Sequence, residues 1–469
     1  MTDYAELDTL IGQIKRAAID VYMTSEDNFY EVEGDRYRYR GSASGMTQWC
    51  TRPGEDGEGG GDVSIDGWPD AFVNNQDEGF RNAFDDIRGQ VDAVFVNLQG
   101  VPTGGSLHYE ETRSMQAAES LTPQGATTAL PPGGGSSLDL NNATLSQRVN
   151  AVHGYSYRLS SLTINAFREG YADRLGAILD GQAALAATMG MAAAGQHAVL
   201  EKLRDDIALF ADQALASLNA LAGEQSSGGG SGAPFAVGGA LLSIAGLGTG
   251  PGAAAFAVAG AVSGLISDLW PERPESKKVA FSGSDLASMM QSITDVKSQL
   301  LETTVDDETV IQQALSNAAS AIRESPASFD IARPQYPRHG SSQESVGGPG
   351  TIVQNHNDMQ RLAATCQLVS DVVDEARGLV SSADAGSGEW RRPEGIGIGS
   401  TGPYDGFSSL GADIIALTRN TAQELAEAAT KLITASLDFE ATDSEIARAL
   451  GREMREVRKV EQEGDLIFD

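Results

Sequence analysis

The chain has 469 residues, with 65 acidic and 33 basic side chains, a net charge of -32 and 6% aromatic residues. That charge argues against nucleic acid as a ligand, whose phosphates would be repelled, and against spontaneous attraction to anionic lipid. The length allows roughly two to four domains, and because aromatic residues are sparse, the core must be built mainly from Ala, Leu, Ile and Val.

The first 99 residues, 1 to 99, are expected to form a helix pair with an irregular insert. Apolar residues recur at helical spacing over residues 4 to 22 and again over residues 80 to 98. Between them, residues 29 to 39 alternate around an acidic turn and predict a small β hairpin, followed by a Gly- and acid-rich loop over residues 53 to 62. The N-terminus has no basic region followed by an apolar run, so we expect no cleavable secretory signal.

A long helical hairpin is expected over residues 139 to 325. It follows residues 100 to 138, which are rich in Pro, Gly, Ser, Thr and Gln and predict a flexible linker. The first arm, residues 142 to 222, would reach about 120 Å as one continuous helix. Five glycines between residues 170 and 195 favour a break or kink in its middle. Residues 326 to 354 predict a second linker.

Residues 225 to 267 carry no charged side chain, and an apolar, Gly/Ala-rich head of this hairpin is expected over residues 233 to 270. Two apolar legs, residues 235 to 247 and 253 to 266, flank a Gly-rich turn, and each is too short for the ~20 residues of a bilayer-spanning helix. Glycines four residues apart permit close approach of two helices, in lipid or in water. The hairpin is therefore either packed against the fold or kept for a membrane or a partner. Its candidate contact residues are Phe235, Leu241, Leu242, Gly246, Gly250, Phe256, Gly260 and Gly264.

Residues 355 to 463 predict the clearest helix pair. Apolar residues recur in steps of three and four over residues 359 to 380 and 410 to 439, with a Gly- and Pro-rich loop at 385 to 406. Heptads of this kind make antiparallel helices pack along their lengths. The whole chain is thus expected to be mainly α, an elongated helical bundle with long antiparallel helices.

The sequence contains no recognisable catalytic constellation. No histidines bracket a Glu at metal-binding spacing, and the two cysteines, Cys50 and Cys366, lie far apart; a disulfide between them is not predicted. Acid runs such as Asp306-Asp307-Glu308 are expected to be solvated faces. The chain is therefore predicted not to be an enzyme and to need no metal or cofactor. An enzyme stays a third hypothesis, which metal or nucleotide binding by the N-terminal region would support.

The last predicted arm ends in Leu437-Asp438-Phe439-Glu440-Ala441-Thr442-Asp443, with an aromatic residue and an acid four apart on one helix face. Here the chain resembles the secreted helical-hairpin substrates of the actinobacterial type VII (ESX) secretion system. Those substrates carry Tyr-x-x-x-Asp/Glu after the hairpin and Trp-x-Gly in its turn. Phe439 and Asp443 match the motif and Trp390 matches the turn, but Phe replaces Tyr, and four residues separate Trp390 from Gly395.

This resemblance implies a secreted or cell-surface effector that leaves the cell by a signal-peptide-independent route. It implies a secretion ATPase that recognises Phe439 and Asp443, and a helical-hairpin partner protein or a homo-oligomer that buries the heptad stripe. The layout of the chain also resembles the helical pore-forming toxins of the cytolysin A and haemolysin BL type. The second hypothesis is therefore a pore-forming toxin that inserts residues 235 to 266 into a membrane, and the two hypotheses are compatible.

Overall fold

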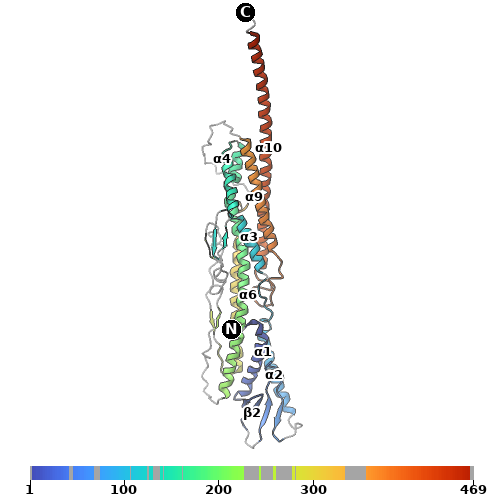
Figure 1. Cartoon of the computed structure of the whole chain (residues 1–469). Helices are drawn as coiled ribbons and strands as arrows, with labels where there is room; N and C mark the ends of the chain where they lie inside the picture. Colours follow the sequence, from blue (N-terminus) through green and yellow to red (C-terminus); the bar gives the residue numbers. More distant parts are fainter. Residues whose placement is uncertain are drawn as a thin grey trace.

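The computed structural model describes residues 3–41, 46–67, 74–105, 107–123, 126–129, 138–140, 142–160, 162–226, 242–244, 257–259, 277–279, 281–332 and 355–464. It is a mainly α, elongated bundle, as the sequence predicts (Figure 1). The α-helices are α1 (Leu7–Thr24), α2 (Asn74–Phe95), α3 (Leu107–Leu121), α4 (Ala143–Tyr157), α5 (Leu162–Phe167), α6 (Asp173–Ser226), α8 (Leu286–Glu324), α9 (His356–Ala383) and α10 (Tyr404–Gly464). Shorter helical turns are η1 (Tyr4–Glu6), the π-helical η3 (Arg168–Ala172) and η5 (Pro326–Ser328). The strands are β1 (Tyr30–Glu33), β2 (Arg36–Tyr39), β3 (Gln48–Thr51), β4 (Val63–Ile65), β5 (Ala126–Ala129), β6 (Leu138–Leu140), β7 (Leu242–Ile244), β8 (Ala257–Ala259) and β9 (Lys277–Val279).

The insert between α1 and α2 is a four-stranded antiparallel sheet, in the order β1-β2-β3-β4, at one end of the molecule (Figure 1). β1 and β2 form the predicted hairpin, in which Glu33 pairs with Arg36 across a two-residue turn. Gly34 in that turn has a φ of 65°, which a residue without Cβ adopts at little cost. Tyr37 and Cys50 on the inner face are fully buried. The expected helix pair is present, but its insert is a regular sheet where an irregular segment was predicted.

The N-terminal unit packs on the long helix α6, mainly through α1. The hydroxyl of Tyr4 donates to the carbonyl of Leu98 over 2.6 Å, and the Arg204 guanidinium of α6 lies 4.1 Å from the centre of the Tyr4 ring. The ring centroids of Phe95 and Phe210 are 5.4 Å apart. These contacts join the N-terminal helices and α6 in one continuous apolar core.

The first arm of the predicted long hairpin is interrupted near its start, and most of its glycines lie inside one helix. α4 ends at Tyr157, and α5 leads through the π-helical turn η3 into α6. α6 then continues unbroken through the remaining glycines. At Gly190 an added Cβ would lie 2.5 Å from Met115 Sδ of α3, so this glycine permits the close approach of the two helices. The break predicted in the middle therefore lies further towards the N-terminus.

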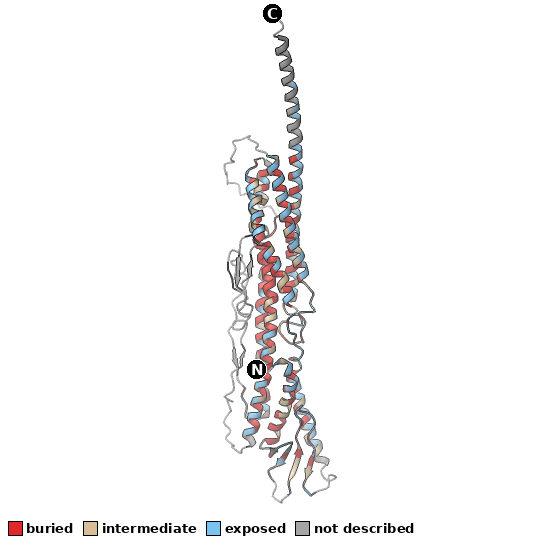
Figure 2. Cartoon of the chain, viewed as in Figure 1, coloured by how far each residue is buried: buried red, intermediate tan, exposed pale blue. Residues whose placement is uncertain are grey.

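α8 returns alongside α6 in the opposite direction, as the hairpin prediction requires. Within the described residues, the stretch Ile164–Gly223 is long and apolar enough to cross a membrane by length and composition. However, 83% of its most apolar window is buried inside the bundle. Figure 2 shows the same helix as mostly buried along its middle. That burial is typical of the core helix of a bundle.

The prediction of a flexible linker over residues 100 to 138 is wrong for Leu107–Leu121, which form α3. This helix packs between α6 and α9. Its sequence is rich in Glu, Ser, Gln and Ala, so the apolar stripe is sparse and the helical period is weak. In the second predicted linker, residues 326 to 332 form η5 and a turn with Phe329 buried, and residues 333 to 354 lie outside the described residues.

Six residues of the two predicted apolar legs are described, and they are strands. β7 pairs with β9, and β8 pairs with β5, so these two strands pair with other segments and not with each other. Glycine-rich flanks weaken a helix, and strand pairing satisfies the backbone polar groups instead. Leu242 lies in β7. The other candidate residues of the hairpin lie outside the described residues: Phe235, Leu241, Gly246, Gly250, Phe256, Gly260 and Gly264.

α9 and α10 form the predicted antiparallel pair. Ser370 Oγ donates to the carbonyl of Ala422 over 2.8 Å, and at the start of α9 His356 Nδ1 lies 2.6 Å from Ser436 Oγ. The predicted apolar stripe of α9 is buried throughout, and that of α10 is buried as far as Leu432. The heptad pattern therefore identifies the faces that meet.

Candidate functional site

Trp390 lies in the segment that connects α9 to α10, and it is fully buried. Its ring packs on the start of α10, with its centroid 5.1 Å from that of Phe407 and 6.0 Å from that of Tyr404. The Tyr404 hydroxyl in turn donates to Asp384, just after α9, over 2.9 Å. The predicted turn residue thus stabilises the turn from inside and presents no surface to another protein in this conformation.

The same connecting segment carries Arg392, which forms an ion pair with Glu308 of α8, and neither side chain has exposed surface. Glu308 also accepts hydrogen bonds from Gln196 Nε2 of α6 over 2.9 Å and from the backbone N–H of Ile398 over 2.8 Å. Arg392 Nε donates to the carbonyl of Ile396 over 2.8 Å. Burial raises the pKa of Glu308 and lowers that of Arg392, and the attraction between the two opposes both shifts. The ion pair therefore holds the turn against α6 and α8.

A second buried carboxyl group, Glu110 of α3, faces the same segment. It has no exposed surface and neither oxygen has a hydrogen-bond partner; the indole N–H of Trp390 interacts with it but does not reach hydrogen-bond geometry. Burial raises the pKa of Glu110 to about 8, and the negative charges of Asp384 and Glu389 add to this shift. The indole and the backbone N–H of Ala385 act in the opposite direction. At neutral pH this carboxyl group is therefore mostly protonated.

At the other end of the hairpin, α10 projects beyond α9 (Figure 1). The contact between His356 and Ser436 marks the start of α9, whereas α10 continues as a helix to Gly464. Near this point Ile433 and Leu437 of α10 are 46% and 53% exposed. α10 therefore continues for about 40 Å beyond this contact with α9.

Phe439 and Asp443 lie on this projecting part of α10, and their side chains are outside the described residues. Phe439 follows Tyr404, the first residue of α10, by about 50 Å along the helix. The structure therefore does not bring the predicted export motif close to Trp390. The motif and the turn occupy opposite ends of one helical hairpin.

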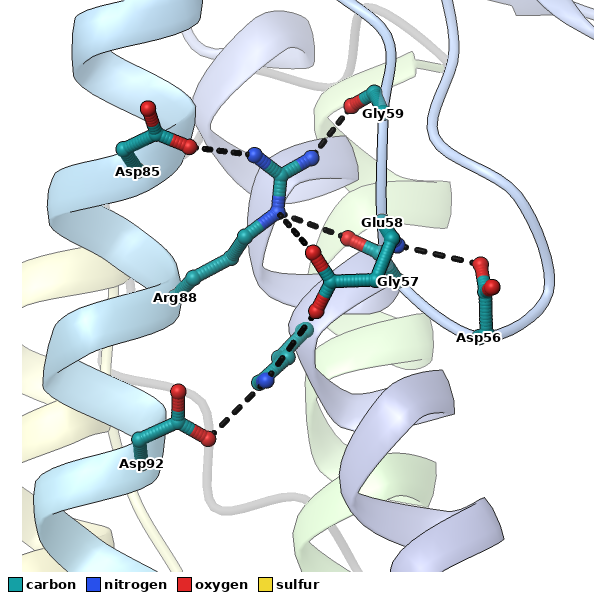
Figure 3. Close-up of polar contacts among 8 residues, drawn as sticks. Asp56, Gly57, Glu58, Gly59, Asp85, Arg88 and Asp92 are labelled. Atoms are coloured by element: carbon teal, nitrogen blue, oxygen red, sulfur yellow. Dashed lines mark hydrogen bonds and ion pairs between the residues drawn. The ribbon is translucent and has the colours of Figure 1, made fainter.

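A third polar cluster holds the loop at residues 53 to 62 on the N-terminal helices (Figure 3). Arg88 of α2 donates to the carbonyl of Gly57 over 2.8 Å and to the carbonyl of Gly59, and it pairs with Asp85 at 2.7 Å. These bonds satisfy the carbonyl groups of a loop that has no strand partner there.

Lys15 of α1 completes the cluster. It lies 2.9 Å from Asp92 of α2 and 3.3 Å from Glu58 of the loop. Burial lowers the pKa of Lys15, but the bonds to the two carboxylates outweigh it, and the net shift is upward. Both cations in the cluster have carboxylate partners, so its geometry fits a structural clamp between α1, α2 and the loop.

The described residues offer little for metal or thiol chemistry. Among them, no group of three or more His, Cys, Asp or Glu side chains could hold a metal ion. Cys50 and Cys366 are buried and are not joined in a disulfide. Burial raises the pKa of each thiol to about 12. Both cysteines therefore remain as unreactive thiols in the folded protein.

Comparisons of the chain with protein-family models, curated proteins and solved structures give no match. Sequence reasoning also missed three residues at the turn: Glu110, Glu308 and Arg392. The expectation that residues 306 to 308 are a solvated face is wrong for Asp307 and Glu308, which are buried. The sequence does contain a signal for the burial of Glu308, because this residue falls between Thr304 and Ile311 on the buried stripe of α8.

Proposed function

We propose that the chain is a secreted substrate of a type VII system, an effector that acts by helix–helix binding to a partner and performs no catalysis. The observation that carries the proposal is the antiparallel α9–α10 hairpin, whose second helix continues past its partner. That part of α10 bears Phe439 and Asp443, the aromatic and acidic residues of the motif. A peptide-binding protein reads an exposed helix through side chains at this spacing.

The two ends of the hairpin take different roles in this proposal. The projecting end of α10 is the export signal, and a secretion ATPase binds it. The turn end has a structural role, because Trp390 and Arg392 are buried and hold the turn in place. Ile433 and Leu437, just before the motif, are exposed apolar side chains that a helical partner can cover.

The test is export from a host that carries a type VII system. Phe439→Ala and Asp443→Ala are each expected to remove the chain from the culture medium while it accumulates in the cells. Asp438→Ala is the matched control, since Asp438 is an exposed acid next to the motif on the same helix. Normal export of both motif variants, or an equal loss with the control, contradicts the proposal.

A pore-forming toxin is the second candidate, supported by the position of the uncharged stretch. Residues 225 to 267 begin at the end of α6 and belong to the segment between α6 and α8, the two arms of the central hairpin. Release of an apolar segment from such a position can insert it into a bilayer. Dye release from liposomes that is lost in Gly250→Glu supports this candidate, and absence of dye release by the wild-type chain argues against it.

A further inference from the structure

α3 lies in a groove between α6 and α9, with Leu107 near one end and Leu121 at the other fully buried. Its middle packs closely on α6, where Met115 lies against Gly190. Two side chains on the buried side of α3 are polar and have no hydrogen-bond partner, namely Glu110 and Ser114. A buried polar group without a partner weakens the packing of the element that carries it. The docking of α3 is therefore less favourable than that of an apolar helix of the same length.

Glu110 lies among acids and lacks a compensating cation. The charged groups that act on it are Asp384 and Glu389 from the segment after α9, whereas the Trp390 indole and the backbone N–H of Ala385 favour its ionised form; the charge of Glu110 acts in turn on Tyr404 at the start of α10. Asp384 accepts hydrogen bonds from the Tyr404 hydroxyl and from Ser408 Oγ, the latter over 2.7 Å.

Two histidines, one on α3 and one on α6, lie beside carboxylates of their own helices. On α3, His108 Nδ1 lies 3.2 Å from Glu111 on the exposed side of the helix. On α6, His197 lies 3.1 Å from Glu201. Ionised Glu110 would therefore place a negative charge in a buried site beside two further acids, with only the Trp390 indole and the Ala385 N–H to favour it.

The protonation of Glu110 determines whether a rise in pH strengthens or weakens the docking of α3. In the docked helix the pKa of Glu110 is about 8, against 4.5 for an exposed Glu. Between these two values docked α3 binds a proton that undocked α3 does not hold. Docking is thus favoured as the pH falls towards 4.5 and is weakened as the pH rises through 8.

We infer that α3 is a detachable helix whose docking between α6 and α9 is controlled by the protonation of Glu110. At low pH α3 stays docked between α6 and α9 and covers Trp390. A rise in pH from about 5 to 8 weakens this docking and the packing around Trp390. A full proton difference changes the docking constant by up to about tenfold per pH unit. The inference concerns the conformation of the chain and does not depend on the proposed export.

Hydrogen exchange of the full chain, followed by mass spectrometry from pH 5.5 to 7.5, tests this inference. The opening constant of α3 is the observed exchange rate divided by the intrinsic rate at each pH, taken relative to peptides from the middle of α6. It is expected to rise by about 30- to 100-fold over this range in the wild type. Glu110→Gln, which cannot ionise, is expected to give a flat profile, and the control Glu111→Gln is expected to keep the wild-type slope.

A second variant covers the case in which the amide of Glu110→Gln disturbs the fold. Glu110→Leu replaces the unpartnered carboxyl group with an apolar side chain and is expected to give the same flat profile with stronger protection of α3. A flat profile in the wild type overturns the inference, and so does a wild-type slope in either substitution of Glu110.

Discussion

Arg392→Met is expected to destabilise the protein by about 3–5 kcal/mol, because it leaves Glu308 as an uncompensated buried charge. Neither side chain of the pair has exposed surface, so solvent screens the interaction little. After the substitution Glu308 keeps only the bonds from Gln196 and from the N–H of Ile398. Protonation of Glu308 in the variant limits the loss of stability, because burial already raises the pKa of Glu308 and favours its neutral form.

Urea unfolding at pH 7, followed by circular dichroism, measures this loss. The double variant Glu308→Met/Arg392→Met removes both charges, and buried pairs replaced by apolar residues are often close to neutral in stability. It is therefore expected to be more stable than Arg392→Met alone. A loss below about 1 kcal/mol for Arg392→Met, or a double variant less stable than the single one, refutes the reasoning.

Two further predictions concern the N-terminal unit and the thiols. Asp20→Asn is expected to lower the free energy of unfolding by about 2–3 kcal/mol, because Asp20 accepts a hydrogen bond from the Tyr37 hydroxyl over 2.7 Å and pairs with Arg52. Limited proteolysis of this variant should cleave residues 25 to 67 first. Cleavage that is unchanged from the wild type contradicts this prediction. Cys50 and Cys366 are expected to react with a disulfide reagent at pH 8 only in denaturant, because burial raises both thiol pKa values to about 12. Rapid reaction of the folded chain contradicts this expectation.

The C-terminal helix pair could be predicted from the sequence because its information is local and periodic. From Met359 to Val380 the predicted apolar residues of α9 recur in steps of three and four and are all buried, with Ala363 and Ser370 buried beside them. The same regularity predicts the stripe of α10 as far as Leu432. A repeated apolar stripe shows which face of a helix packs on its partner, so the buried face could be predicted from the spacing of the apolar residues.

The rest depends on contacts between distant segments. Residues 107 to 121 resemble a linker in composition, and α3 is stable as a helix because α6 and α9 cover it. Gly190 predicts a helix break by propensity, yet it serves as the contact point for Met115. Arg392 and Glu308 are 84 residues apart, so no local pattern indicates that they pair.

The candidate site could also be predicted only in part from the sequence. The sequence predicts the motif at Phe439 and Asp443 because both residues fall on one helix face, and the structure adds that this part of α10 extends beyond α9. The burial of Trp390 could not be predicted, since it depends on α3 and on the start of α10.

Export of the wild-type chain itself tests the central claim most directly. The chain is expressed in a type VII-competent host and in the same host without its secretion ATPase, and both cells and medium are assayed beside a cytoplasmic marker. The account predicts the chain in the medium of the competent host and its retention in the ATPase-deficient host. Equal amounts in the two media, or retention in both hosts, would contradict it.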